Sequence, residues 1–387
     1  IRILKDCKRI LHDRPAVVLG IESSCDDTGC GIVDTNGNIL VHLAPSRYGG
    51  IIPVFAKKMH NESITAVCEA ALRSANLKLR DVDAIATTVK PGLPMSLQVG
   101  TDFGKYLSSV GNKPFIPIHH MEAHALTARI SEKVEFPYLV LLVSGGHSLL
   151  AVVENVDKFY LLGSTLDNAP GQVMDKVARK LKLNSIPELA KLSGGQAVEV
   201  AARKASNVDT FQFSSVLTTY YNCNFSFAGT YSTAFRHIEK EEQKYEIKAD
   251  QIIPSVYDLC ASFQMTIVNH ICQRTQRAME YIDLMALIPQ DKRTLVVSGG
   301  VACNDLLARA LSVVCQETGF DFVRTPPKLC TDNGVMIAWN GVERWLANKV
   351  IIQGQACDGA FAASIYHETV FQRPLLGAWI SPLHAYR

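Results

Sequence analysis

The feature that most constrains the fold of this chain is a short pattern that occurs twice. In each copy an apolar run of strand length leads into a turn of small and polar residues, and a second strand follows; the copies cover residues 16–33 and 138–153. Either turn alone is typical of a plain hairpin. Two units of equal shape predict a duplicated α/β domain, in which small turn residues let backbone N–H groups approach a phosphate.

The rest of the chain alternates between helical and strand patterns, as an α/β fold requires. Residues 55–75 and 96–110 predict helices, and Gly100 and Gly104 predict close packing of the second one. Later segments predict a helix opened by Ser193-Gly194-Gly195, a long helix over 256–281, a strand over 294–297 followed by Ser298-Gly299-Gly300, and helices from Asn304 onward and over 335–346.

Two histidines, His120 and His124, directly follow a strand predicted over 115–118. In a helix, residues four apart project from one face, and two imidazoles at that spacing can share a divalent metal ion. The order is H-x-E-x-H, with Glu122 on roughly the opposite face. Zinc proteases instead carry H-E-x-x-H, with the Glu as base. The alternative is two core or surface histidines on an amphipathic helix, and a third ligand must come from elsewhere.

Asp332 is the best remaining carboxylate for that third ligand. It lies in a segment, 326–334, that precedes an apolar helix, so the alternative is that it only caps the helix. Two imidazoles and a carboxylate are compatible with zinc, iron, manganese or magnesium. The residues therefore predict a metal site without identifying the metal.

Composition is that of an ordinary globular protein. The chain has 387 residues, long enough for about two domains, and its net charge of +2 neither requires nor excludes a nucleic-acid partner. The 11 cysteines are odd in number and contain no C-x-x-C, which disfavours a disulfide framework or a zinc ribbon and favours a reducing compartment. No apolar run reaches the roughly 18 residues that a membrane helix needs.

The first fifteen residues are basic and begin with Ile1 rather than Met. They predict either the end of an organellar presequence, which we favour, or an extra amphipathic turn. Lys and Arg gather loosely over 73–80 and 176–182. These clusters do not identify a nucleic-acid-binding face.

Five motifs in a fixed order carry a resemblance to a known family. They lie at 21–28, 119–124, 142–147, 297–304 and 330–338, and read IESSCDDT, HHMEAH, LVSGGH, VSGGVACN and CTDNGVMIA. On these motifs the chain resembles the universal tRNA N6-adenosine threonylcarbamoyltransferase family, the TsaD-type proteins formerly described as glycoproteases, over roughly residues 16–345. With its basic N-terminal segment it is most similar to the mitochondrial branch.

The resemblance implies an α/β fold of the duplicated actin-like type, that of the sugar kinase and Hsp70 superfamily, with two lobes around a central cleft. The expected division of the chain is an N-terminal extension over 1–15, a first lobe over 16–136, a second lobe with a helical insertion over 137–345, and a C-terminal segment over 346–387.

The resemblance also implies an acyl transfer. A threonylcarbamoyl group passes from threonylcarbamoyl-AMP, supplied by a separate synthase, to N6 of the adenosine 3′ of the anticodon in tRNAs that read codons beginning with A, and AMP leaves. The expected partners are tRNA and this donor, in the mitochondrial matrix, with no membrane insertion. A homodimer is expected because the chain would work without a cytosolic accessory complex.

By motif position, the resemblance implies one divalent metal ion per subunit on His120, His124 and Asp332. A metal there would polarise the donor carbonyl or anchor its phosphate, and the acceptor amine would gain from proximity. No general base is identified; Asp26 and Asp27 are the candidates. The residues implied for the donor, nucleoside included, are Leu142, Val143, Ser144, Gly145, Gly146, Asp175, Gly195, Glu199 and Asn304.

The chain departs from the family pattern at four places. Asp27 replaces the usual Glu, Gln196 the usual Pro and Lys90 the usual Gly, and the loop over 225–231 lacks the basic residue expected there. These changes predict altered contacts to the substrates rather than a different reaction.

Two alternative functions belong to other classes. An ATP-dependent phosphotransferase of the same fold would release ADP and would give no reason for the histidine pair. A non-catalytic scaffold that binds tRNA or a partner would keep its activity after His124→Ala. The H-x-E-x-H order disfavours a metalloprotease.

Overall fold

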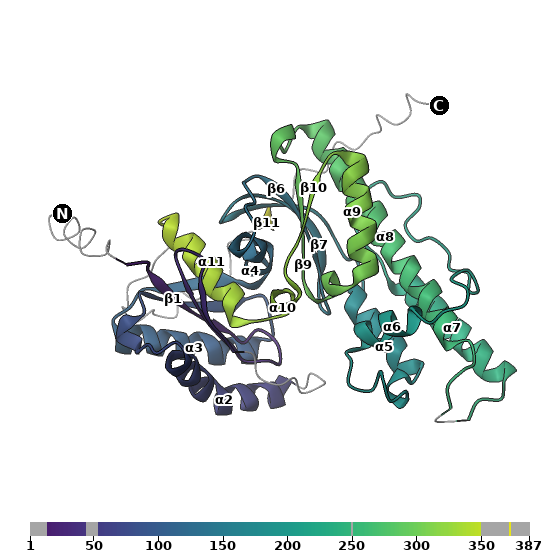
Figure 1. The fold of residues 1–387 in the computed structure, drawn as a ribbon, viewed down its shortest axis with the longest axis horizontal. Coiled ribbons are helices and arrows are strands. Elements are labelled where there is room, and N and C mark those ends of the chain that lie inside the picture. The colour runs from purple at the N-terminus through teal and green to yellow at the C-terminus, as the bar shows by residue number, and fades with distance from the viewer. Residues whose placement is uncertain (1–13, 44–52, 249–250, 350–370, 373–387) are drawn as a thin grey trace. The chain divides into compact units, whose positions relative to one another are not determined.

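The computed structural model describes residues 14–43, 53–248, 251–349 and 371–372, which form two compact units (Figure 1). The first unit contains the described residues up to Val134 together with Val296–Cys303 and the segment from Val323 to residue 349. The second unit contains Glu135–Leu295, Asn304–Phe322 and residues 371–372. Each unit is built around one β-sheet.

The first unit contains a five-stranded sheet in the order β3-β2-β1-β4-β5. β1 pairs antiparallel with β2 and parallel with β4, and β4 pairs parallel with β5. The strands are β1 (Val17–Glu22), β2 (Gly29–Asp34), β3 (Ile39–Leu43), β4 (Ala84–Lys90) and β5 (Phe115–His119). The described α-helices of this unit are α2 (Pro53–Ser74), α3 (Pro94–Gly111), α4 (His120–Leu126), α10 (Pro327–Cys330) and α11 (Gly334–Leu346).

Helices cover both faces of this sheet, because the side chains of each strand point alternately to one face and the other. Leu19 and Ile21 of β1 lie in one apolar core with Ile64 of α2 and Val99 of α3. The intervening residues of β1 point the other way, because successive side chains of a strand alternate between its faces. On that second face lies α11, as Figure 1 shows.

Glycines line the contact between α11 and the sheet. A Cβ added at Gly20 would overlap the backbone nitrogen of Ala338, and one added at Gly31 would overlap that of Val335. The helix contributes Gly334, where a Cβ would overlap the backbone of β2. Backbone therefore packs on backbone here, and the first turn of α11 is held against β1 and β2.

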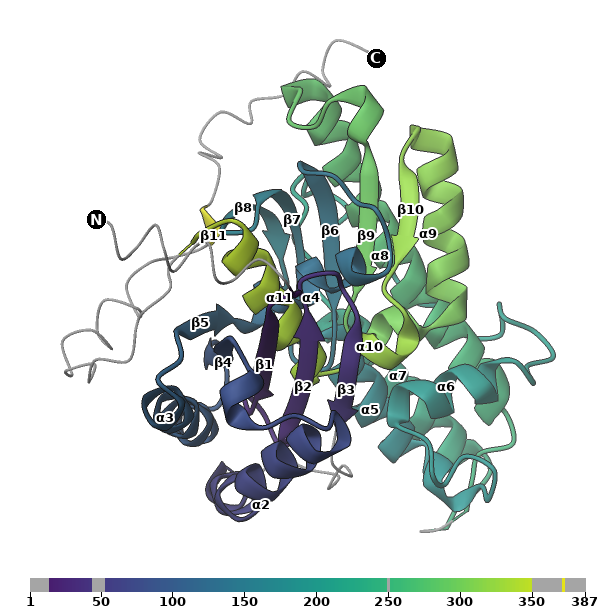
Figure 2. The ribbon, with the colours of Figure 1, turned by 60° about the vertical axis from the view of Figure 1, so that its left-hand side comes forward.

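The second unit repeats the same strand order, which confirms the predicted duplication. Its six-stranded sheet has the order β10-β9-β6-β7-β8-β11, so β8-β7-β6-β9-β10 matches β3-β2-β1-β4-β5 of the first unit (Figure 2). The strands are β6 (Tyr138–Val143), β7 (Ser148–Asn155), β8 (Lys158–Ser164), β9 (Thr294–Ser298), β10 (Asp321–Arg324) and β11 (Phe371–Gln372). The last residues of β9 and β10 belong to the chain segments counted with the first unit. Together with the similarity reported below, this topology supports the predicted duplicated actin-like α/β fold.

Among the described residues, four α-helices lie between β8 and β9 and a fifth follows β9; the helical insertion stays a prediction. These helices are α5 (Pro170–Lys180), α6 (Gly194–Ala202), α7 (Ala228–Lys244), α8 (Val256–Met285) and α9 (Asp305–Thr318). None of the described helices is long and apolar enough to cross a membrane.

The division of the chain differs from the expected one at α11. The sequence assigns residues 137–345 to the second lobe, whereas α11 packs on β1 and β2 and belongs to the first unit. An apolar helix pattern does not reveal which of two sheets the helix covers, because both sheets present an apolar face. The predicted extension over 1–15 and segment over 346–387 lie mostly outside the described residues.

The glycine contact gives a stability prediction. Gly31→Ala forces a methyl group into the backbone of α11, and such overpacking costs roughly 1–3 kcal/mol or more of the free energy of unfolding. Gly300→Ala is the matched control, because its nearest heavy atom would lie at 3.8 Å. Urea unfolding, with hydrogen exchange of the α11 amides, should separate the two variants. Equal stability would contradict the packing described here.

Candidate metal centre and donor-binding segments

The histidine pair lies on α4, which begins where the buried strand β5 ends. His120 is the first residue of the helix, and every residue of α4 is buried. The two rings lie with centroids 4.7 Å apart and nearly perpendicular, at 86°. Glu122, between them in sequence, is turned away and accepts a hydrogen bond of 2.6 Å from Arg344 of α11. The predicted helical pair is therefore present.

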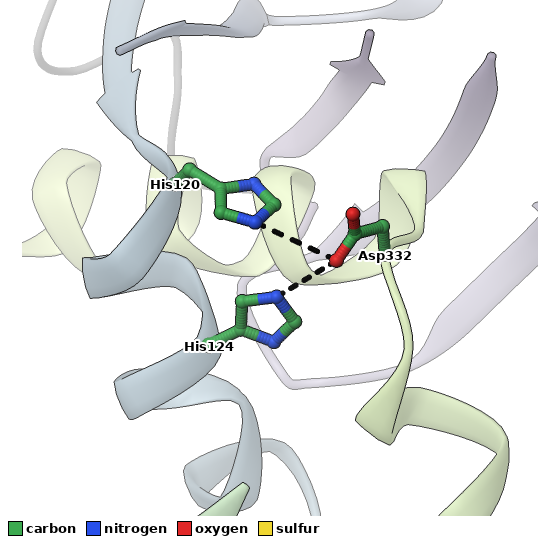
Figure 3. Close-up of side chains that lie close together, drawn as sticks. All are labelled: His120, His124 and Asp332. Carbon is green, nitrogen blue, oxygen red and sulfur yellow. Dashed lines mark hydrogen bonds and ion pairs between the residues drawn. The ribbon is translucent and has the colours of Figure 1, made fainter. Parts of the chain in front are cut away.

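Asp332 reaches the same place from a segment 208 positions further along the chain. Its Oδ1 atom lies 3.0 Å from His124 Nε2 and 3.5 Å from His120 Nε2, as Figure 3 shows. Asp332 does not cap α11, because the side chain of Asn333 does so by accepting a hydrogen bond from Met336 N. Asp332 is thus available to the histidines rather than to the helix end.

The three side chains fit a metal ion. Their candidate ligand atoms, one per residue, all lie within 4.8 Å of one another. Neutral imidazoles and a carboxylate are common ligands of zinc, iron and manganese. Among the described residues, Nδ1 of His124 is buried without a hydrogen-bond partner, while Nε2 of the same ring faces Asp332.

Glu22 orients His120 through Nδ1, the ring nitrogen on the side away from Asp332. Its carboxylate, at the end of β1, accepts hydrogen bonds from Ser24 N (2.6 Å) and from the hydroxyl of Thr88. Nδ1 of His120 lies 3.1 Å from Ser24 Oγ and 3.4 Å from Glu22 Oε2. With Nδ1 turned to these oxygens, Nε2 is the nitrogen that faces Asp332, as in carboxylate–histidine–metal arrangements.

The electrostatics of the cluster favour a cation. Burial disfavours a charged imidazole, but the carboxylates of Asp332 and Glu22 outweigh it and raise the pKa of His120 to about 9. Burial likewise opposes the charged form of Glu22, yet His120 lowers its pKa below the usual value. Two carboxylates around two buried rings thus attract positive charge.

Asp26 and Asp27 lie in the half-buried turn between β1 and β2. The turn is pinned by His60 of α2, whose Nδ1 lies 2.7 Å from Thr28 Oγ1 and whose Nε2 lies 3.0 Å from Cys25 O. No local sequence pattern indicated this role for His60. Both aspartates stay candidates for the general base.

In the second unit, the turn after β6 has free space beside Gly145 and Gly146. Leu142 and Val143 are buried, so these two side chains face the core. Ser144 Oγ accepts from Gly146 N and His147 N at 3.3 and 3.0 Å, which closes the turn. A Cβ added at Gly145 or Gly146 would meet nothing within 4 Å. The space beside the two glycines can therefore receive a ligand.

Local contacts link this turn to the other predicted donor residues. Gly171, at the start of α5, donates to Ser144 O, and Asp175 lies one turn further along that helix. The Cβ position of Gly194, beside Gly195, lies against the Asp175 carboxylate. The N-terminus of α5 thus adjoins the turn, and the N-terminus of α6 adjoins Asp175.

Glu199 and Asn304 complete this arrangement at the start of α9. Glu199 Oε1 accepts from Asp305 N at 2.9 Å, and the Asn304 side chain caps the helix by accepting from Leu307 N. Glu199 also borders a pocket of about 250 Å³ between α6, α8 and α9. All predicted donor residues therefore lie in the second unit, connected through neighbouring contacts.

The aromatic loop that precedes α7 belongs to the core. Phe225 and Phe227 are fully buried, so this run packs internally. Asp167 accepts hydrogen bonds from Phe227 N at 2.8 Å and from Ser226 Oγ at 2.5 Å. The loop is therefore fixed to the segment that leads into α5.

Comparison with known proteins decides the family. The profile described as tRNA N6-adenosine threonylcarbamoyltransferase, TsaD, matches residues 38–339. The chain belongs to this family. The mitochondrial tRNA N6-adenosine threonylcarbamoyltransferase of Danio rerio is 46% identical over 345 residues, with 88% of this chain and 85% of the relative covered. The human mitochondrial protein is 46% identical over 345 residues, covering 87% of this chain and 82% of the relative.

Membership confirms the predicted family, and the chain is a transferase that modifies tRNA. The mitochondrial names of the relatives, which include a probable Drosophila melanogaster enzyme 41% identical over 393 residues, support a mitochondrial location. Among solved structures, HypF of T. kodakarensis has a TM-score of 0.54 at 13% identity, over 86% of this chain and 48% of that chain. This likeness supports the fold alone.

Glu22 gives a prediction about metal affinity. Glu22→Gln keeps the size of the side chain but weakens its hold on His120, and loss of such a partner typically reduces metal affinity roughly 10- to 100-fold. Competition with a chromogenic chelator for Zn²⁺ and Mn²⁺ measures the effect. Glu69→Gln, on the exposed side of α2, is the control. Equal dissociation constants for the two variants would refute an orienting role.

Proposed function

We propose that the enzyme transfers threonylcarbamoyl from threonylcarbamoyl-AMP to N6 of the adenosine 3′ of the anticodon in tRNAs that read codons beginning with A. In this step the adenosine nitrogen forms a bond to the donor carbonyl carbon and loses a proton. The bond from that carbon to the phosphate oxygen breaks, and AMP leaves with the electron pair. Family membership, together with the His–His–Asp cluster, carries this proposal.

His120, His124 and Asp332 would hold one divalent metal ion per subunit. When bound, a zinc, iron, manganese or magnesium ion supplies Lewis-acid polarisation of an oxygen or an anchor for a phosphate. The role of the chain is to orient the ligands: Glu22 and Ser24 fix the ring of His120, and burial of both rings keeps bulk water from competing for them.

The turn over 142–146 would hold the phosphate of the donor. Gly145 and Gly146 leave room for close approach, and the N-terminus of α5 adjoins the turn. The positive end of a helix dipole favours an anion at such a place. Buried Leu142 and Val143 would support the turn from below rather than touch the donor.

The nucleoside of the donor would lie between α5, α6 and α9. Carboxylates such as those of Asp175 and Glu199 are suited to accept hydrogen bonds from ribose hydroxyl groups. The pocket beside Glu199 is also lined by Arg203, Leu306 and Arg309, which can pack against a flat base. Gly195 and Asn304 would shape its entrance.

Three further statements stay predictions. They are supply of the donor by a separate synthase, a homodimeric assembly, and residence in the matrix. A phosphotransferase of the same fold remains the rival reaction. It would release ADP from ATP and an acceptor, whereas transfer as proposed releases AMP from the donor.

Reconstitution tests the proposal and the metal ligands together. The enzyme is mixed with the synthase, threonine, bicarbonate, ATP and unmodified tRNA, and the tRNA is digested to nucleosides for mass analysis. We expect threonylcarbamoyladenosine from the native chain. His124→Ala and Asp332→Ala should reduce its rate of formation at least 100-fold and remove the bound metal, because transfer depends on the ion.

His42→Ala is the matched control, because His42 is exposed on β3. It should keep both activity and metal content. Circular dichroism checks that the variants stay folded. Full transfer by His124→Ala would remove that residue from the site and would favour a scaffold role, and absence of product from the native chain would refute the reaction itself.

A further inference from the structure

Two adjacent tyrosines stand out on the surface of the second unit. Tyr220 and Tyr221 are 58% and 63% exposed, in the loop between α6 and α7. We call residues 216–222 the tyrosine loop. Phe225 and Phe227, a few positions further along the chain, are by contrast fully buried. Two neighbouring rings left in water need a reason that core packing does not supply.

The tyrosine loop is held in shape by a buried arginine. Arg274 of α8 is 1% exposed, and its guanidinium donates to the backbone carbonyls of Val216, Leu217, Tyr220 and Asn222 at 2.6–3.2 Å. Burying a guanidinium is costly unless its N–H groups find acceptors. One side chain thus holds four backbone carbonyls of the tyrosine loop, which fixes the backbone that carries Tyr220 and Tyr221.

A second arginine gives the loop positive charge. Arg277, one turn after Arg274, donates to the carbonyl of Tyr220, and its guanidinium carbon lies 5.6 Å from the ring centroid of Tyr221. The segment 211–224 contains no acidic residue. The carboxylate of Glu280 accepts a hydrogen bond from the side chain of Gln276. The surface therefore combines two exposed aromatic rings with the half-buried guanidinium of Arg277.

Exposed aromatic rings beside an arginine are a combination that binds single-stranded RNA. Unpaired bases stack on tyrosine and on guanidinium planes, and the charge attracts phosphates. We propose that the tyrosine loop docks the unpaired bases of the anticodon loop of the tRNA substrate, with Tyr220 and Tyr221 as stacking platforms. This inference rests on the proposed function, because it specifies where that substrate binds.

The tyrosine loop is also coupled to the donor-binding segments within the same unit. It runs directly into Phe225, which accepts a hydrogen bond from Leu166 N, and into Ser226 and Phe227, which donate to Asp167. That segment leads into α5, which carries Asp175. RNA held by the loop is therefore held by the same rigid scaffold as the donor.

The test measures RNA affinity and steady-state kinetics of the full chain. A fluorescent anticodon stem-loop RNA is titrated with the native enzyme, with the double variant Tyr220→Ala/Tyr221→Ala, and with Tyr220→Phe/Tyr221→Phe. Loss of both rings should weaken binding roughly 10- to 100-fold, and the Phe variant should bind within about two-fold of native. The KM for tRNA should rise in the Ala variant while kcat and AMP binding stay unchanged.

Tyr106→Ala is the matched control, because Tyr106 is 60% exposed on α3 in the other unit. It should bind RNA as the native chain does. If the native chain modifies tRNA and the Ala variant has the native KM, the docking proposal fails while the proposed function stands. If light scattering shows that the Ala variant changes only the oligomeric state, the loop contacts a second copy of the chain and the proposal is overturned. If the native chain forms no product, the proposed function fails instead.

Discussion

The contact on which the rest of the first unit depends is the close packing of α11 on β1 and β2. Because Gly20, Gly31 and Gly334 leave no side chains in the interface, the start of α11 has one position on the sheet. Asp332 immediately precedes this helix, so its place is set by backbone packing. The same helix is tied to α4 by the Arg344–Glu122 pair at 2.6 Å, and to the turn after α4 by Arg129–Glu343 at 2.7 Å. The histidines and the aspartate are thereby brought together, although Asp332 lies 208 positions after His124.

In the cluster of His120, His124, Asp332 and Glu22, the cost of burial opposes the attraction between the carboxylates and the rings. Two imidazoles and the carboxylate of Glu22 are buried, which is unfavourable for isolated charges. The carboxylates instead stabilise positive charge at the rings, as the raised pKa of His120 indicates. A divalent ion would satisfy the same field with fixed geometry, and its binding would add to the stability of the folded unit. The segments of the second unit that we propose to hold the donor differ, because open glycines beside the N-terminus of α5 are suited to an anion.

Much of this could be predicted from local patterns. The repeated strand–turn–strand units predicted two sheets of equal topology, and four-residue spacing predicted that His120 and His124 share a helix face. What could not be predicted depends on contacts between distant segments. The sequence did not show that α11 covers the first sheet, that Asn333 rather than Asp332 caps it, or that Glu22 supports His120. A lone carboxylate at the end of the buried strand β1 was the available signal for Glu22. Likewise, nothing local indicated that Arg274 would brace a loop more than fifty positions away.

The central claim is that His120, His124 and Asp332 bind one metal ion. Its most direct test is an anomalous-scattering map from crystals of the enzyme reconstituted with Mn²⁺ and recorded near the manganese absorption edge. The account predicts one strong peak per chain, at coordination distance of about 2.0–2.3 Å from Nε2 of both histidines and from a carboxylate oxygen of Asp332. A peak held by other residues, or no peak at these three side chains under saturating Mn²⁺, would contradict it.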